Sequence, residues 1–295
     1  MTSRPMPDAA AIETAAAQLT ASRPAYAALL RFYGPVFSAQ ARAAGDTSPK
    51  PIRLDAAALQ MRRKEGFALI EPASFAIDDR AAEKLLAEIC GLAAVAGEKL
   101  RQAGKALALA MAEGAAMADL FGDVLEDKGC IQALAEAKKV PKDLLSLLLS
   151  LAIRPSITAG ARQLTEHLTD DLDQRSHCPL CGSSPIIGEL DADGRQWVHC
   201  SLCWHRWPVE RMACLFCGNR SSETQEYMYS EEEAEYRVYL CNGCRSYLKV
   251  VDTRKLDRIF FPPLEQVVSL HLDIRASENG YAHAMGAGTP IVGER

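Results

Sequence analysis

Four Cys-x-x-Cys pairs within residues 178–244 constrain this chain more than any other feature of its sequence. Eight of the ten cysteines fall in this stretch. Each pair leaves two residues between its sulfurs, so one tight turn can direct both thiolates at one ion, and two pairs complete a tetrahedral site. The sequence therefore predicts two metal sites, with ligands Cys178, Cys181, Cys200, Cys203, Cys214, Cys217, Cys241 and Cys244.

An internal repeat indicates how the pairs combine. The segment Cys-Pro-Leu-Cys-Gly at 178–182 resembles Cys-Leu-Phe-Cys-Gly at 214–218, and glycine suits a turn that needs positive φ. The other two pairs each follow a β-rich segment and precede aromatic residues. The repeat predicts that the first pair combines with the second and the third with the fourth. An interleaved pairing of the first with the third is the alternative, and it leaves the repeat unexplained.

The cysteine set limits the chemistry. Zinc and iron both accept tetrahedral thiolate sites, so spacing alone does not distinguish them. A closed four-cysteine site leaves no position for water or substrate, which argues against Lewis-acid hydrolysis. The neighbouring His177, His199 and His205 are interpreted as surface residues or as supports of the ligands. We also expect this small β domain to lack a core of its own, so that metal removal unfolds residues 178–244 while the helical part survives.

Charge and hydropathy limit the partners. The chain has 295 residues and a net charge of −5 at pH 7, which gives no support to a nucleic-acid or anionic-membrane partner. No run reaches the roughly 18 apolar residues of a membrane span, and no secretory signal is visible in the first thirty residues. Cysteines spaced for metal, without such a signal, indicate the reducing cytoplasm.

Residues 1–173 are expected to form a helical domain, because alanine and other good helix formers dominate them. Asp78 is a candidate N-cap, and a leucine-rich helix that starts near Pro141 should be central in a bundle and end at Arg154-Pro155. Cys90 and Cys130 are interpreted as buried or partly buried free thiols. Helix breaks are expected at Pro24, Gly34-Pro35, Gly45, Pro51, Gly66, Pro72, Gly129, Pro141 and Pro155.

Two segments follow the helical part. Residues 174–252 are predicted to be a tandem four-cysteine metal-binding domain, and residues 253–295 a linker, a C-terminal helix and a tail. The helix is expected over 264–277, with Gly280 as its C-terminal cap. The predicted fold class is α+β: an all-α N-terminal domain, then tandem rubredoxin-like or zinc-ribbon β knuckles, then a C-terminal helix.

The cysteine motifs and their flanks resemble the formate dehydrogenase accessory protein family, FdhE. The resemblance rests on His-Cys-Pro-Leu-Cys-Gly-Ser-Ser-Pro at 177–185, His-Cys-Ser-Leu-Cys at 199–203 with Trp207, Cys-Leu-Phe-Cys at 214–217 and Cys-Asn-Gly-Cys-Arg-Ser-Tyr-Leu-Lys at 241–249. The helical first half and Val-Val-Ser-Leu-His-Leu-Asp at 267–273, followed by Gly280-Tyr281, are similar too. The ending at 288–293 departs from the aromatic, proline-containing ending of some members.

The resemblance implies a cytoplasmic accessory protein, not an enzyme, that binds the catalytic subunit of respiratory formate dehydrogenase and supports its assembly or activation. It implies that the eight cysteines hold two iron ions in rubredoxin-like sites, so iron is favoured over zinc. No nucleic-acid partner and no membrane insertion are expected, and a homodimer is left open.

Two alternatives come from other functional classes. A zinc-ribbon adaptor for nucleic acid or protein needs a basic face if it binds nucleic acid, and acidic residues outnumber basic ones between 178 and 249. A thiol-redox protein is the other alternative, although its motif usually opens a helix rather than a turn between strands.

Overall fold

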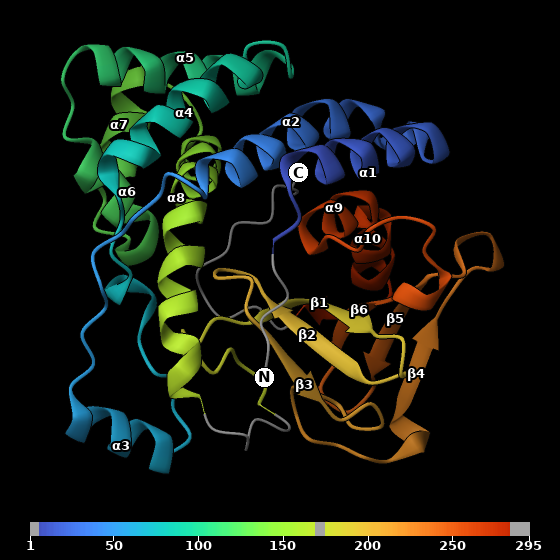
Figure 1. Cartoon of the computed structure of the whole chain (residues 1–295). Coiled ribbons are helices and arrows are strands. Elements are labelled where there is room, and N and C mark those ends of the chain that lie inside the picture. Colours follow the sequence, from blue (N-terminus) through green and yellow to red (C-terminus); the bar gives the residue numbers. More distant parts are fainter. Residues whose placement is uncertain (1–5, 169–174, 284–295) are drawn as a thin grey trace. The chain divides into compact units, whose positions relative to one another are not determined.

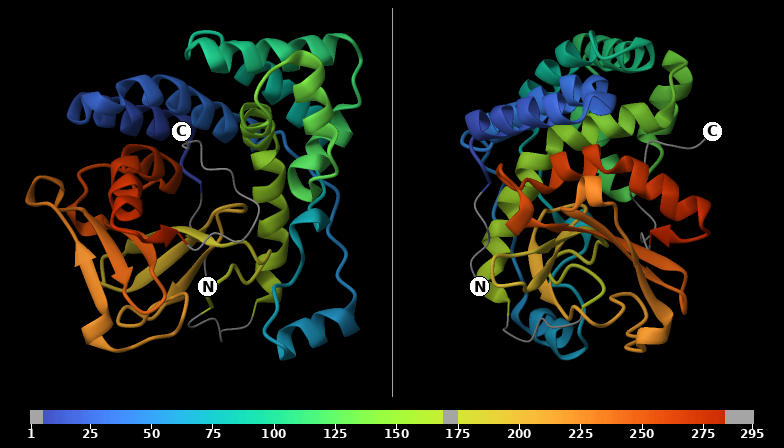
Figure 2. Two further views of the ribbon diagram at one scale, coloured as in Figure 1. Left: turned by 180° about the vertical axis from the view of Figure 1, so that it is seen from behind. Right: turned by 90° about the vertical axis from the view of Figure 1, so that its right-hand side faces the viewer.

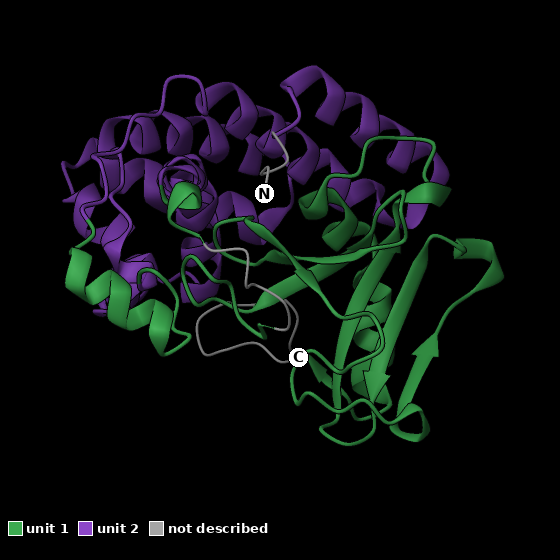
Figure 3. Cartoon of the chain, turned by 60° about the horizontal axis from the view of Figure 1, so that its bottom comes forward, with its two compact units in different colours: residues 1–5, 54–70, 164–287 green, residues 6–53, 71–163, 288–295 purple. Residues whose placement is uncertain are grey.

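The computed structural model describes residues 6–168 and 175–283, and the chain divides into two compact units (Figures 1 and 3). Among these residues, the helical unit contains 6–53 and 71–163, and the sheet unit contains 54–70, 164–168 and 175–283. The predicted α+β class is confirmed: helices come first, then a sheet with two four-cysteine groups, then C-terminal helices. The domain boundaries at 173 and 252 stay a prediction, and most of the predicted tail lies outside the described residues.

The helical unit follows several local signals in the sequence. Asp78 caps its helix as predicted, since its carboxylate accepts the Ala81 N–H at 3.1 Å. Cys90 and Cys130 are free thiols, one buried and one partly buried, as predicted. The helices are α1 (Ala9–Ser22), α2 (Ala27–Ala43), α4 (Asp79–Ala93), α5 (Glu98–Ala112), α6 (Met117–Glu126), α7 (Cys130–Lys138) and α8 (Lys142–Leu164), whose last residue falls in the sheet unit.

Helix α8 runs through Pro155 without a break, so the predicted helix end at Arg154-Pro155 is wrong. Proline has no N–H to donate to the carbonyl four residues earlier, which is that of Leu151. The buried side chain of Gln40 in α2 supplies the missing donor, with its Nε2 2.7 Å from the Leu151 oxygen. A contact distant in sequence thus replaces the lost helical bond. Helix α2 also continues through Gly34-Pro35, where a break was expected.

Replacement of Gln40 by leucine should lower the free energy of unfolding of the helical unit by about 1–3 kcal/mol, because the Leu151 carbonyl is then buried without this donor. In a Pro155→Ala background the restored N–H can bond that carbonyl, so the effect of Gln40→Leu should shrink. Denaturant unfolding of the wild type, both single variants and the double variant, followed by far-ultraviolet circular dichroism, measures the coupling. Equal losses in both backgrounds would contradict the compensation.

Together with the turn that follows it, α8 forms the one segment of the described chain that is long and apolar enough to cross a membrane, Lys142–His167. Its most apolar window is 67% buried inside the structure. Core helices of soluble proteins pass the same test of length and composition. The central, buried position predicted for the leucine-rich segment is what the structure shows, with Leu145, Leu148 and Leu149 buried.

The sheet unit places both sequence repeats in one sheet (Figure 1). Its described strands follow the order β3-β2-β1-β6-β5-β4, with β7 beside β6. Neighbours within each repeat are antiparallel, whereas β1 and β6 pair in parallel at the junction between the repeats. The strands are β1 (Pro185–Leu190), β2 (Gln196–Cys200), β3 (Arg206–Val209), β4 (Gln225–Met228), β5 (Tyr236–Cys241), β6 (Ser246–Asp252) and β7 (Ala282–His283).

Helices α9 (Pro262–Val268) and α10 (Leu270–Glu278) pack against the sheet, as Figure 2 shows. The predicted single helix over 264–277 is interrupted at Ser269, whose φ of −114° and ψ of 16° are not helical. The predicted cap is confirmed, because Gly280 has φ of +75° and the N–H groups of residues 280 and 281 return to carbonyls in the last turn of α10.

The sheet unit has a substantial core, so the expectation that this part of the chain lacks one is wrong. Its fully buried large side chains include Trp207 and Tyr236. Many smaller apolar side chains are buried with them: Ile187, Leu190, Val198, Val238, Leu248, Val250, Val251, Phe260, Phe261, Leu264 and Val268. Helix α3 (Ala56–Lys64), which also belongs to this unit, buries none of its residues.

Candidate metal centres

The first cysteine group, site one, is formed at one end of β1 and β2. Cys178 and Cys181 lie in the turn that precedes β1, Cys200 ends β2, and Cys203 lies in the turn after it. All four sulfurs lie within 4.8 Å of one another, with Cys181 3.5 Å from Cys200 and 3.7 Å from Cys203. A tetrahedral ion with metal–sulfur bonds of about 2.3 Å spaces its sulfurs by about 3.8 Å. The group therefore has the dimensions of a zinc or iron site.

The second group, site two, repeats this arrangement with Cys214, Cys217, Cys241 and Cys244. The sulfur–sulfur distance is 3.7 Å from Cys214 to Cys244 and 3.7 Å from Cys217 to Cys241. The structure thus combines the first pair with the second and the third with the fourth, as the repeat predicts, and not in the interleaved order. All these cysteines are free thiols rather than disulfides. Their role as ligands stays a prediction.

The two knuckles share one backbone design. Gly182 and Gly218 have φ of +74° and +70°, and each donates its N–H to the carbonyl of the first cysteine of its pair at 2.9 Å. This is the conformation for which the sequence predicts glycine. Trp204 and Arg245, which follow the second pair of each site, also have positive φ, of 58° and 57°. The alignment of the two repeats places them at the same position, but their residue types did not signal it.

The electrostatics of site one favour an ion. Burial raises the pKa of the Cys178 and Cys203 thiols well above the ordinary value. Side-chain hydrogen bonds with Cys178, Cys200 and Cys203 lower the pKa of Cys181. Several thiolates in so buried a place need a cation to balance them. Backbone N–H groups of Leu202 and Cys203, each 3.4 Å from the Cys200 sulfur, give further support to negative sulfur.

The two sites differ in exposure. Every cysteine of site one is buried, and the N–H groups of Leu69 and Ile70 bond the carbonyls of its first knuckle at 3.0 Å. In site two, Cys217 is exposed and only Cys241 is fully buried. Sequence reasoning missed the contribution of residues 69 and 70, because nothing local connects that segment with the cysteines. The ion of site two should be the one that solvent reaches more easily.

Arg245 joins the turn that carries Cys241 and Cys244 to the end of α10. Its guanidinium donates to the Asn279 carbonyl at 2.6 Å and lies 3.9 Å from the ring centre of Tyr281. The side chain of Arg245 therefore has a structural role that lies outside the motif. The sequence around Arg245 gives no local sign of this contact, since the partner segment follows more than thirty residues later.

Two of the three histidines near the cysteines are buried. The His199 Nε2 lies 2.9 Å from a Glu189 carboxylate oxygen, which also faces Arg206 at 3.5 Å. His205 stacks on Trp207, and burial lowers its pKa to about 4. Of the two possibilities that the sequence left for them, surface residues or supports, these buried histidines fit the second, and both contact the sheet beside site one. His177 is exposed.

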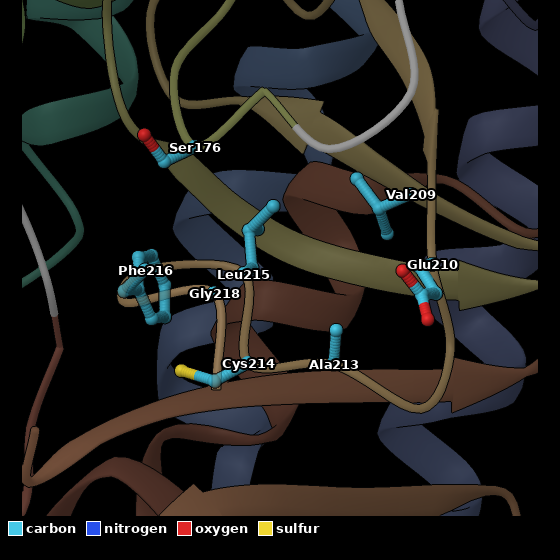
Figure 4. A pocket seen from close by; sticks show the side chains of 8 residues that line it. All are labelled: Ser176, Val209, Glu210, Ala213, Cys214, Leu215, Phe216 and Gly218. Atoms are coloured by element: carbon cyan, nitrogen blue, oxygen red, sulfur yellow. The ribbon is translucent and has the colours of Figure 1, made fainter. Parts of the chain in front are cut away.

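A small pocket of about 160 Å³ opens beside site two (Figure 4). Glu210 on its wall pairs with Arg220 at 2.9 Å, so its carboxylate is already engaged. The pocket is smaller than the roughly 300–1,000 Å³ of most small-molecule sites. Its lining residues are Ser176, Val209, Glu210, Ala213, Cys214, Leu215, Phe216 and Gly218.

Comparison with known proteins identifies relatives in sequence. No protein-family model matches the chain. A protein named FdhE homolog from Aquifex aeolicus is 34% identical over 111 residues, which are 36% of this chain and 39% of the relative. An FdhE homolog from Haemophilus ducreyi is 32% identical over 47% of this chain and 46% of the relative. The matches therefore span less than half the length of these relatives.

A solved structure has the same fold. The crystal structure of the FdhE protein from Pseudomonas aeruginosa superposes with a TM-score of 0.63 and covers 99% of this chain and 100% of its own, at 19% sequence identity. At that identity, the likeness establishes the fold alone. The chain is thus similar in part of its sequence to proteins named FdhE or FdhE homolog, and it shares the fold of one of them over nearly its whole length.

Proposed function

We propose that the protein is an accessory factor, not an enzyme, that binds the catalytic subunit of a respiratory formate dehydrogenase in the cytoplasm and supports its assembly or activation. The observation that supports this role is the pair of four-sulfur groups in a chain that is similar in sequence to proteins named FdhE homolog. In each group all four tetrahedral positions are taken by protein sulfur, which leaves no position for a reacting water or substrate. The small pocket beside site two is also poorly suited to a substrate.

The eight cysteines are proposed as the ligands of two iron ions. The sulfur spacing suits iron and zinc equally, and the family resemblance favours iron. Protein purified without air should contain two iron ions per chain and should be red in the ferric state. A colourless protein with only zinc would overturn the iron assignment and leave the accessory role to be tested separately.

The client is tested by co-purification. The tagged protein should retain a formate dehydrogenase catalytic subunit expressed in the same cells, and should not retain the catalytic subunit of an unrelated exported oxidoreductase. Formate dehydrogenase activity should fall in cells that lack the protein, while the amount of transcript for its catalytic subunit stays unchanged. Failure to retain the subunit, in the presence of fully metal-loaded protein, would overturn the proposed partner.

A nucleic-acid adaptor finds no support in the sheet unit. Residues 221–235 carry six glutamates and no lysine or arginine. A phosphate backbone is repelled by such a stretch, and most of the affinity of nucleic-acid binders comes from basic side chains. Binding to DNA or RNA that weakens steeply with salt would revive this alternative.

A further inference from the structure

We propose that the outer edge of β4 binds an extended basic peptide segment, which joins the sheet as an additional parallel strand. Strand β4 ends the strand order of the sheet and pairs with β5 alone among the described strands. Figure 1 shows it at the border of the sheet. In an edge strand, alternate N–H and C=O groups point away from the sheet, where another chain can bond them.

The first repeat shows how such an edge is used in this fold. By position in the repeat, β4 corresponds to β1, and β5 corresponds to β2. The side of β1 that faces away from β2 is occupied by β6, which runs parallel with Gly188 opposite Val250 and Leu190 opposite Asp252. The corresponding side of β4, which faces away from β5, pairs with no other described strand. The chain itself thus shows that this edge of the repeat accepts a parallel strand.

The surroundings of β4 specify the charge of the added strand. Residues 221–235 carry six glutamates and no basic residue, and Glu223, Glu226, Glu231 and Glu232 are exposed at or near the two ends of β4. Lysine and arginine side chains complement this set. A second copy of β4 is disfavoured, because it would bring a second set of glutamates to the same place.

Two exposed aromatic rings favour the same kind of occupant. Tyr227 and Tyr229 are 58% and 57% exposed, and their ring centres are 5.7 Å apart. Tyr227 lies in β4 and Tyr229 directly follows the last residue of that strand, so the two rings lie at the end of the edge that an added strand would occupy. A lysine or arginine of that strand can lie against them in a cation–π contact. Backbone bonds would supply affinity, and the tyrosines and glutamates would select basic side chains.

This inference deepens the proposed function, because a basic segment of the client would be the natural occupant. The binding itself is tested without the client, by fluorescence anisotropy with a labelled peptide of alternating arginine and valine about ten residues long. We expect saturable binding to the metal-loaded full chain. A peptide with the same side chains and every backbone amide N-methylated should bind at least about tenfold more weakly. Equal binding of the two peptides would mean charge attraction alone and would overturn the added strand.

Protein variants locate the site. Glu223→Lys/Glu232→Lys reverses one exposed charge beyond each end of β4, and Glu65→Lys/Glu83→Lys makes the same change in net charge at exposed positions elsewhere. The first variant should bind the peptide about tenfold more weakly and the second within about twofold of the wild type. Amide hydrogen exchange at residues 225–228 should slow on binding in the wild type. Equal weakening by both variants, or unchanged exchange at β4, would overturn the location.

The client experiment separates the two proposals. If Glu223→Lys/Glu232→Lys loses the peptide and also loses the formate dehydrogenase subunit, the β4 edge is the client site. If it loses the peptide and keeps the subunit, the edge is excluded as the client site and the proposed function stands. If the wild type binds the peptide and never retains the subunit, the edge stands and the proposed function fails.

Discussion

A chelator added to the metal-loaded protein should remove the ion of site two much faster than the ion of site one. Cys217 of site two is exposed, whereas all four cysteines of site one are buried and their first knuckle is bonded by residues 69 and 70. Release from site one requires local opening of the sheet unit. If local opening costs about 1.4 kcal/mol more at site one than at site two, the open form of site one is already about ten times less populated. Metal release followed with a coloured chelator should therefore show two phases of equal amplitude.

Single ligand variants assign the phases. Cys217→Ser should abolish the fast phase and leave the sheet unit folded, while Cys200→Ser should abolish the slow phase and lower the stability of the unit further, with its central strands still paired. All three tryptophans of the chain, Trp197, Trp204 and Trp207, lie in this unit, so their fluorescence reports its unfolding selectively. One phase that contains both ions, or loss of the slow phase in Cys217→Ser, would contradict the assignment.

The sheet core changes what complete metal removal should do. The sequence led us to expect that the whole of residues 178–244 would unfold, because the knuckles alone have little to bury. The structure shows β1 packed with α9 and β6 packed with α10, around buried apolar side chains other than cysteine. We therefore expect proteolysis of the metal-free protein to begin in the second knuckle, between residues 211 and 220, while the paired central strands remain protected.

The two four-cysteine groups were predictable because their signal is local. Two residues between cysteines, and a glycine after the pair, describe one turn whose geometry does not depend on the rest of the chain. The pairing of the knuckles was predictable because the chain repeats itself. The helix caps at Asp78 and Gly280 were predictable for the same reason, since each depends on residues within one helical turn.

The features that could not be predicted depend on contacts distant in sequence. Helix α8 survives Pro155 because a glutamine more than a hundred residues earlier bonds Leu151. The two repeats share one sheet because β1 meets β6 in parallel, which no property of either strand alone indicates. Residues 69 and 70 join the first knuckle in the same way. Buried charged side chains, such as that of Lys249, could not be predicted either, because hydrophobic patterning assigns charged residues to the surface.

Removal of the carboxylate of Asp273 should destabilise the sheet unit by about 3–5 kcal/mol, because it leaves a buried ammonium without its partner. Lys249 in β6 has a side chain that is 0% exposed, and its Nζ lies 2.6 Å from Asp273 in α10, which is 12% exposed. Burial lowers the pKa of Lys249, and Asp273 acts against that shift. The Tyr247 hydroxyl also donates to Asp273 at 2.8 Å. Asp273→Ala, followed by tryptophan fluorescence in urea, measures the loss.

A matched series tests whether the loss comes from the orphaned charge. In Lys249→Met/Asp273→Leu no charge remains, and with Tyr247→Phe added no hydroxyl lacks its acceptor. Apolar replacement of a complete buried ion pair is often neutral or stabilising, so this triple variant should recover most of the stability that Asp273→Ala loses. Its metal content should match that of the wild type, because none of the three side chains is a proposed ligand. A triple variant as unstable as Asp273→Ala would mean that the charges themselves, rather than the packing of α10 on β6, hold this face of the sheet together.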